Sequence, residues 1–179
     1  ASAHDFETDG IYYNITSDTD LTVEVTFRGD DFVQHDEYSG TVTIPSTVSY
    51  SGKMYSVTSI GVTAFAGCSS LAAVTIPESV MSIRSAAFGK CGSLASINIP
   101  EGVTSISKSV FEGCSSLASI TIPESVMSIG VSAFDGCSSL TSINIPASVT
   151  SIEAHAFKNC SSLTSVAIPD GLTSIEYWA

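Results

Sequence analysis

Hydrophobic and polar positions recur at one fixed interval along most of this chain. In each period a short segment alternates polar and apolar residues, as in Ser96–Pro100, which reads Ser-Ile-Asn-Ile-Pro. Such alternation predicts a short β-strand with one buried face, and the proline ends the strand because it cannot donate the next ladder hydrogen bond. Four residue types keep the period: Leu71, Leu94, Leu117, Leu140 and Leu163; Pro77, Pro100, Pro123, Pro146 and Pro169; Phe65, Phe88, Phe111, Phe134 and Phe157; and Cys68, Cys91, Cys114, Cys137 and Cys160.

A repeat of this length with apolar residues in phase is typical of a solenoid. Each repeat forms one coil that cannot bury its apolar face alone, so the coils stack on one another. From Leu71 onward the repeats share the pattern L-x-x-[IV]-x-I-P-x-x-[VL]-x-S-I-x-x-x-[AV]-F-x-x-C-x-S. This pattern predicts one parallel strand per 23-residue repeat, with Val103 and Ile106 turned inward and the Phe and Cys positions lining the back of each coil.

The N-terminal segment at residues 1–40 lacks the repeat and predicts a β-hairpin cap. Ile11–Thr16 and Leu21–Phe27 are rich in Ile, Tyr, Thr and Val, and polar residues 17–20 separate them. Two such runs around a polar turn are typical of a β-hairpin. A cap is expected because a bare solenoid end exposes its apolar core. We therefore predict an N-terminal cap at residues 1–40 and a solenoid at residues 41–179, within one continuous structural unit.

The first repeat carries an insertion. Val42–Pro45 matches the strand of a repeat, yet the interval from Pro45 to Pro77 is longer than the interval from Pro77 to Pro100. The extra residues fall at about 46–55, where Ser51 and Gly52 suit the turn of a small projecting hairpin.

The last repeat, which begins at Leu163, is incomplete, because the pattern stops after Ile175 and before the next Phe and Cys. Tyr177 and Trp178 could fold over the last coil, or the chain could be a piece of a longer array, and we favour the second interpretation. An uncovered coil at this end is a candidate surface for a homodimer.

The repeat pattern resembles the BspA-type leucine-rich repeat, also called the Treponema pallidum type. The likeness rests on the Pro, Phe and Cys positions that hold phase, and it covers residues 38–179 strongly. The segments Asp9–Tyr13 (Asp-Gly-Ile-Tyr-Tyr) and Gly40–Pro45 (Gly-Thr-Val-Thr-Ile-Pro) are similar to the N-terminal region of such proteins from gut and oral bacteria. The resemblance implies a right-handed leucine-rich-repeat solenoid, mostly β, with an irregular or short helical convex side.

The same resemblance implies a secreted or cell-surface protein. Proteins of this type are associated with adhesion to host matrix, other cells or other proteins, and the family has no catalytic residues or cofactor to carry over. The leading hypothesis is a non-catalytic module that binds a host or bacterial surface protein or glycan. The alternative is a structural spacer or a self-assembling repeat scaffold.

The net charge of −12 argues against nucleic acid and anionic membranes as partners, because both require clustered Lys and Arg. No apolar run reaches the roughly 18–20 residues that span a bilayer, so membrane insertion is not expected. No serine lies in G-x-S-x-G and no glycine-rich phosphate loop is present, so the sequence predicts no enzyme. His155 shares a repeat column with Thr63, Ala86, Ser109 and Ser132, which suggests a variable surface position.

The five cysteines form a column in which no spacing resembles a zinc-binding C-x2-C pair, and their odd number rules out complete internal pairing. Side chains of a column point the same way, which suits packing better than bridging. We expect buried thiols that act as small apolar fillers, with a redox or metal role as the alternative.

The candidate binding face consists of the outward strand positions, among them Thr75, Asn98, Thr121 and Asn144. These residues are small and uncharged, so the face would support shallow polar contact rather than deep anchoring, or would simply be solvated. A second column holds the carboxylates Glu78, Glu101 and Glu124. Such a line of carboxylates could meet a basic partner or a hard cation, or could serve only solubility.

Tyr50 and Tyr55 lie on the inserted hairpin and are expected to be exposed, which makes them candidates for a binding hot spot. Asp30, Asp31, Asp36 and Glu37 cluster near His35, and such an oxygen-rich loop is either a calcium site or a solvated acidic loop. Because the spacing matches no calcium-binding motif, we predict no metal site.

Overall fold

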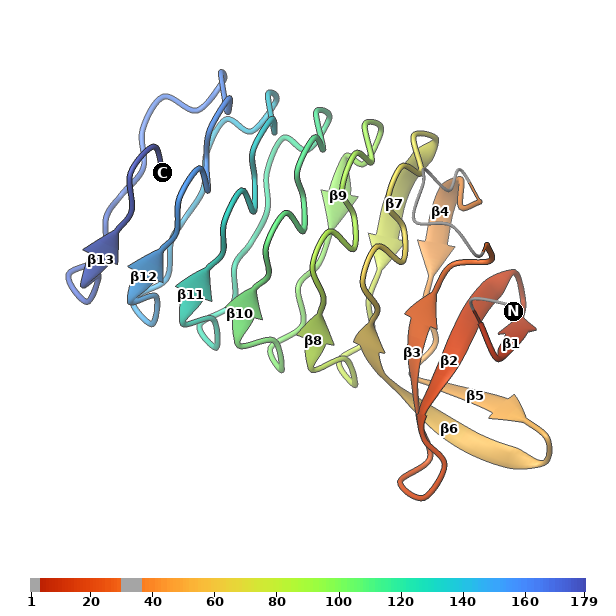
Figure 1. Ribbon diagram of the computed structural model, residues 1–179. Coiled ribbons are helices and arrows are strands. Elements are labelled where there is room, and N and C mark those ends of the chain that lie inside the picture. The colour runs from red at the N-terminus through yellow and green to blue at the C-terminus, as the bar shows by residue number, and fades with distance from the viewer. Residues whose placement is uncertain (1–3, 30–36) are drawn as a thin grey trace.

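The computed structural model describes residues 4–29 and 37–179, and all the regular structure in them is β-strand (Figure 1). Successive coils stack side by side into an elongated rod, and the N-terminal strands lie at the end opposite β13. The strands are β1 (Phe6–Thr8), β2 (Ile11–Ser17), β3 (Thr22–Thr26), β4 (Gly40–Thr43), β5 (Thr47–Tyr50), β6 (Lys53–Ile60), β7 (Leu71–Thr75), β8 (Ser82–Ile83), β9 (Ser96–Ile97), β10 (Ser105–Ile106), β11 (Ser128–Ile129), β12 (Ser151–Ile152) and β13 (Ser174–Ile175).

The strand predicted on the limb that ends at the proline is present only in the first three coils, as β4, β7 and β9. β4, β7 and β9 pair in parallel, with Ala73 opposite Ser96. Farther along, the limb continues only as single parallel bridges from Thr121 to Asn144 and from Asn144 to Ala167. Each step is one full repeat, so equivalent positions of successive repeats lie next to one another.

A second parallel ladder adds to the predicted one. β10, β11, β12 and β13 pair in order, with Ser105 opposite Ser128 and Ile106 opposite Ile129. Between β8 and β10 a side chain takes part instead, since the Ser107 hydroxyl donates to the Ile83 carbonyl over 2.6 Å. The sheet expected from the sequence is therefore one of two that run the length of the rod.

The third limb, which carries Phe and Cys, contains no helix or strand in the described repeats but is still joined to the next coil by main-chain bonds. The Phe88 amide donates to the Val110 carbonyl over 3.0 Å, and the Phe111 amide donates to the Ala133 carbonyl over 2.9 Å. A residue with left-handed backbone lies two positions before each phenylalanine of this limb: Thr63, Ala86, Ser109, Ser132 and His155.

His155 therefore occupies a position with a backbone constraint, and it is only partly exposed. Its φ is 60°, and its ring is half-buried, edge-on to the Tyr177 ring with 5.7 Å between centroids.

The phenylalanines predicted to line the back of each coil are buried in the core, where their rings stack. Phe65, Phe88, Phe111 and Phe134 are fully buried, and neighbouring rings lie 5.0 to 5.8 Å apart. Phe157 continues the stack at 5.4 Å but is only half-buried. Such offset stacks stabilise the fold beyond the area that the rings bury.

The N-terminal hairpin is confirmed, because β2 and β3 pair antiparallel. β3 pairs in parallel with β6 of the first repeat, and β6 pairs with β8, so the cap joins the solenoid through continuous main-chain pairing. Tyr38 closes the end of the phenylalanine stack, with its ring centroid 4.5 Å from that of Phe65. Its hydroxyl donates to the Thr26 carbonyl over 2.8 Å and accepts from the Tyr12 amide over 3.1 Å.

The inserted hairpin consists of β5 and β6, which pair antiparallel from Thr47 opposite Ser56 to Tyr50 opposite Lys53. Ser51 and Gly52 both have positive φ, at 49° and 77°. Two such residues are what the two-residue turn of a tight hairpin requires. The boundary between cap and solenoid at residue 40 remains a prediction.

Replacing Phe111 with Ala should lower the free energy of unfolding by about 3–5 kcal/mol, because the change leaves a cavity between two stacked coils. Phe157→Ala is the matched control, and it should cost clearly less because Phe157 is half-buried at the end of the stack. Urea unfolding followed by circular dichroism measures both variants. Equal losses for the two would contradict a continuous aromatic core.

Candidate functional site

The four strand-face candidates, Thr75, Asn98, Thr121 and Asn144, are exposed on the limb that ends at the proline. Pairing of β7 with β9 places Thr75 beside Asn98, and a parallel bridge joins Thr121 to Asn144. The structure thus brings these residues into one row along the rod.

Asn98 differs from its neighbours, because its amide is already bound by the preceding coil. Its Oδ1 accepts from the Ile76 amide over 2.8 Å, and its Nδ2 donates to the Ile76 carbonyl over 2.8 Å. The side chain therefore replaces a rung of the ladder where regular pairing ends. Asn98 therefore stabilises the strand face, and a ligand that bound its amide would have to compete with the two bonds to Ile76.

A shallow depression lies on this face over Ala73–Thr75 and Ser96–Asn98, with a volume of about 410 Å³. Its described walls come from β7 and β9 and carry no charge. A surface of this kind suits contact over a broad area rather than the enclosed pocket of a small ligand.

The carboxylate candidates Glu78, Glu101 and Glu124 are all exposed in the turns that follow the prolines. Glu78 is held in place, since its Oε2 accepts from the Glu101 amide over 3.3 Å. The three carboxylates are therefore accessible to solvent.

The two tyrosines of the inserted hairpin differ in solvent exposure. Tyr50 is 37% exposed, and its ring stacks on Phe6 with 4.2 Å between centroids. Tyr55 is only 2% exposed, so the expectation that it is exposed is wrong. The alternation of β6 explains the difference, since Tyr55 and Val57 share the face that turns toward the core while Met54 is on the other.

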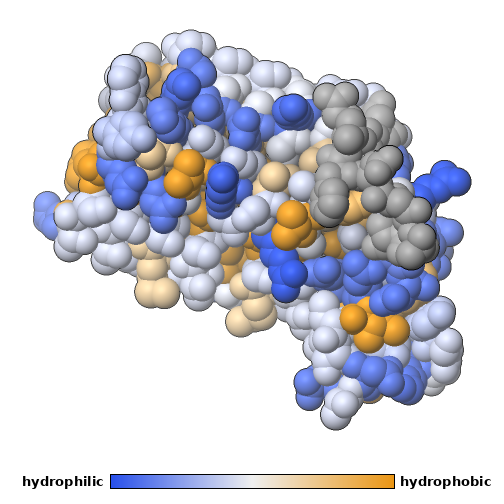
Figure 2. Space-filling model, viewed as in Figure 1, coloured by the Kyte–Doolittle hydropathy of each residue, from blue (hydrophilic) through white to orange (hydrophobic). Residues whose placement is uncertain are grey.

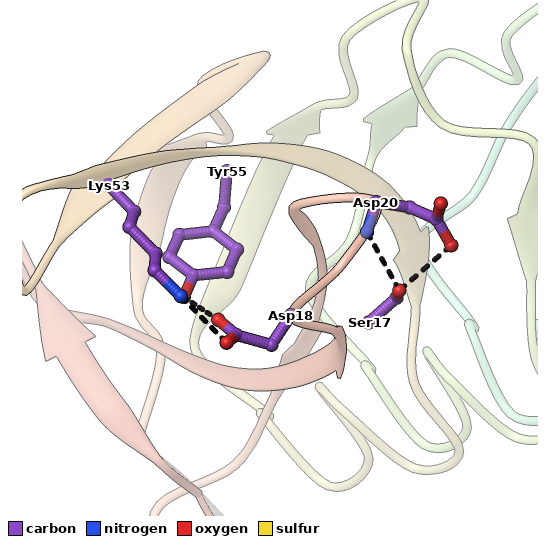
Figure 3. Close-up of polar contacts among 5 residues, drawn as sticks. All are labelled: Ser17, Asp18, Asp20, Lys53 and Tyr55. Atoms are coloured by element: carbon purple, nitrogen blue, oxygen red, sulfur yellow. Dashed lines mark hydrogen bonds and ion pairs between the residues drawn. The ribbon is translucent and has the colours of Figure 1, made fainter.

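The Tyr55 hydroxyl reaches a polar cluster at the base of the cap, shown in Figure 3. It donates to Asp18 Oδ1 over 2.5 Å, and Lys53 Nζ donates to Asp18 Oδ2 over 2.6 Å. The hydrogen bond from Lys53 lowers the pKa of Asp18, and the bond to Asp18 raises the pKa of both Lys53 and Tyr55. Beside it, the Ser17 hydroxyl donates to Asp20 over 2.8 Å.

This cluster ties the β2–β3 turn to the inserted hairpin and was not expected from the sequence. Asp18 and Lys53 are 35 positions apart, so no local spacing indicates that they meet. Because the pair is exposed to solvent, it orients the hairpin more than it stabilises the fold.

The acidic loop falls mostly outside the described residues, which exclude Asp30, Asp31, His35 and Asp36. Glu37 is described, and its Oε2 accepts from the Arg28 amide over 2.7 Å. Within residues 4–29 and 37–179 no group of three or more His, Cys, Asp or Glu is arranged to hold a metal ion. The same described ranges contain no helix with the length and hydropathy of a membrane span.

The cysteine column is buried and unbridged, as predicted, and the structure adds a hydrogen bond at each step. Every thiol from Cys91 onward donates to the carbonyl of the phenylalanine 26 residues before it, at 3.0 to 3.2 Å. Burial raises the pKa of Cys114, and it raises those of Cys137 and Cys160 to about 12 and 11. These thiols are therefore protonated at neutral pH and are poor nucleophiles.

The repeat geometry agrees with a known family. The family model described as the BspA type leucine-rich repeat region, in six copies, matches residues 42–153 and 128–179. The chain belongs to the BspA-type leucine-rich repeat family. A comparison with curated proteins found no match.

Solved structures of bacterial leucine-rich repeat proteins resemble the cap as well as the repeats. The Treponema pallidum leucine-rich repeat protein is 34% identical, with a TM-score of 0.77 over 92% of this chain and 71% of its own. A leucine-rich repeat protein from Bacteroides ovatus is 30% identical, with a TM-score of 0.67 over 94% of this chain and 54% of its own. A leucine-rich cell surface protein from Faecalibacterium prausnitzii is 27% identical, with a TM-score of 0.68 over 98% of this chain and 50% of its own.

The chain thus spans about half the length of the Bacteroides and Faecalibacterium proteins that it matches. The likeness extends through the cap as well as the repeats, since it covers 92% or more of this chain in all three.

The buried thiols should resist alkylation in the folded protein. With iodoacetamide at pH 8 we expect Cys160 to react first, because it is 8% exposed and its pKa is about 11. Below that pKa, the alkylation rate of Cys160 should rise about tenfold for each unit by which the pH is raised, since the thiolate is the nucleophile. Mass spectrometry of the cysteine peptides measures each site.

The control is the same reaction in urea, where all five thiols should react at similar rates. A middle thiol such as Cys114 that reacts equally fast with and without urea would contradict the buried column.

Proposed function

We propose that this chain is a non-catalytic adhesion module that binds a surface protein or glycan, outside the cell or on its surface. The observation that carries the proposal is the shallow depression over β7 and β9, on a face whose exposed side chains are small and uncharged. The likeness to a cell surface protein from Faecalibacterium prausnitzii supports the location.

The chemistry of the face favours many weak contacts over a few strong ones. Strong protein interfaces concentrate Trp, Tyr and Arg, and the row of Thr75, Asn98, Thr121 and Asn144 supplies none of them. A partner would approach the strands closely and be oriented by the carboxylates at the edge of the face. A basic partner is favoured, since complementary charge speeds encounter and fixes orientation.

Purified protein should bind saturably to some members of a panel of immobilised matrix proteins and host-cell glycans. Thr75→Arg places a bulky cation in the depression and should weaken that binding at least about tenfold. Thr104→Arg is the matched control, because Thr104 is equally an exposed threonine but precedes β10 on the other ladder. Biolayer interferometry measures both variants against the same ligand.

Equal binding by the wild-type chain and both variants would show that the depression is not the binding site. Failure to bind any member of the panel would instead favour a structural spacer.

A second candidate is self-assembly through the C-terminal coil. A recess of about 180 Å³ at this end is lined, among the described residues, by apolar side chains that include Ile145, Phe157, Ile168 and Ile175. Ile168 and Ile175 are each 55% exposed, and Figure 2 shows hydrophobic surface at the end where β13 lies. Apolar surface of this kind favours association, here with a second copy of the chain.

Sedimentation velocity should show a dimer that increases with protein concentration. The double change of Ile168 and Ile175 to Glu should keep the chain monomeric, because it places charge in the contact. Met81→Glu is the control, since Met81 is 58% exposed in a middle coil. A wild-type chain that stays monomeric at high concentration would rule out this candidate.

A further inference from the structure

A cleft at the N-terminal end of the molecule adjoins the strand face, since Thr43 of its wall pairs with Thr75. It has a volume of about 360 Å³ and is lined by the β1–β2 segment, the end of β4 and the inserted β5–β6 hairpin. Its wall draws on segments from Thr8 to Met54 that are distant in sequence. The volume is near the lower end of the roughly 300–1,000 Å³ of small-molecule sites.

Tyr13 in the wall of this cleft has a buried hydroxyl without a hydrogen-bond partner in the described part of the chain. The tyrosine is 0% exposed, and its ring stacks on Phe6 with 5.3 Å between centroids. The other buried tyrosines differ, since Tyr38 donates to the Thr26 carbonyl and Tyr55 donates to Asp18. A buried unpaired hydroxyl destabilises a fold, so its presence beside a cleft indicates a role in binding.

The carboxylate of Asp9 belongs to the same wall and is exposed to solvent. Burial raises the pKa of Tyr13, and the negative charge of Asp9 raises it further. The Tyr13 hydroxyl is therefore protonated and can donate, while Asp9 can accept.

The rest of the wall is rich in hydroxyl groups. Thr8, Thr43, Thr47 and Ser49 contribute side chains that form no hydrogen bond with any described residue. Val48 and the 58%-exposed Met54 add apolar surface, and no described Lys, Arg or His lines the cleft.

We propose that this cleft binds a neutral sugar, as one or two rings at the end of a glycan. The inference builds on the proposed adhesive function and names a site and a ligand class for it. Sugar hydroxyls can donate to Asp9 and accept from Tyr13 and the threonines, while the C–H faces of the ring pack on Met54. An anionic sugar is disfavoured by Asp9 and by the net charge of −12.

A cationic ligand fits this wall less well than a sugar does. The described wall offers a single carboxylate, and Asp9 is exposed, so a charge at depth would be unpaired. The hydroxyl groups outnumber that carboxylate and suit a ligand that both donates and accepts along its length.

The test is saturation-transfer NMR of the purified chain with glucose, galactose, mannose, N-acetylglucosamine, lactose and maltose. Sialic acid and lysine methyl ester serve as an anionic and a cationic probe. We expect at least one neutral sugar to bind and neither charged probe to do so. Absence of binding by all the neutral sugars, or preferential binding of a charged probe, overturns the inference.

Tyr13→Phe identifies the site, because it removes only the unpaired hydroxyl. The dissociation constant for the sugar should rise at least about tenfold, as for the loss of one hydrogen bond in a desolvated site. The melting temperature should stay equal or rise, since no hydrogen bond in the described chain is lost. Unchanged sugar binding, or a lower melting temperature, contradicts the proposal.

Tyr38→Phe is the matched control, since it removes a paired hydroxyl from a buried tyrosine outside the cleft. It should lower the melting temperature and leave sugar binding unchanged. The two proposals can fail separately. Binding of matrix proteins that Thr75→Arg weakens, without any binding of sugars, refutes only the sugar site, whereas a chain that binds neither ligand class refutes both.

Discussion

Main-chain hydrogen bonds between coils are the constraint on which this structure depends. A single coil has few partners for its own amides, so they pair with the neighbouring coil, as Ala95 does with the Ala72 carbonyl over 2.9 Å. All three limbs of the repeat are joined in this way. The paired segments of the repeat must therefore stay in register, and extra residues are accommodated only where they project from the coil, as the β5–β6 hairpin does in the first repeat. The phenylalanine and cysteine columns follow from the same register, since equivalent side chains are brought into contact along the rod.

The periodic part of the fold could be predicted because the same residue pattern recurs in every repeat. Burial of Phe111, Cys114 and Leu117 follows directly from that repetition. The second ladder was hidden, because the Val-x-Ser-Ile segment does not alternate and its two-residue strands depend on the neighbouring coil. For Tyr55, placement on an inserted hairpin suggested exposure, although the alternation from Met54 to Val57 carried the correct signal.

One candidate site could likewise be predicted from the repeat, and the other could not. The row from Thr75 to Asn144 can be read from the repeat alone, since identical strand positions lie side by side. The cleft around Tyr13 cannot, because the cap and the inserted hairpin have no internal repeat and meet only in the folded chain. Asn98 shows a further limit, since its sequence position marks it as exposed but does not reveal that Ile76 holds its amide.

The direction of the inter-coil bonds has a mechanical consequence. These bonds run along the long axis of the rod, roughly perpendicular to the short strands that they join. Tension between the two ends would therefore load them in series, and the coils would peel apart one after another instead of shearing together. A rod built in this way would lengthen in steps under tension rather than break at a single point.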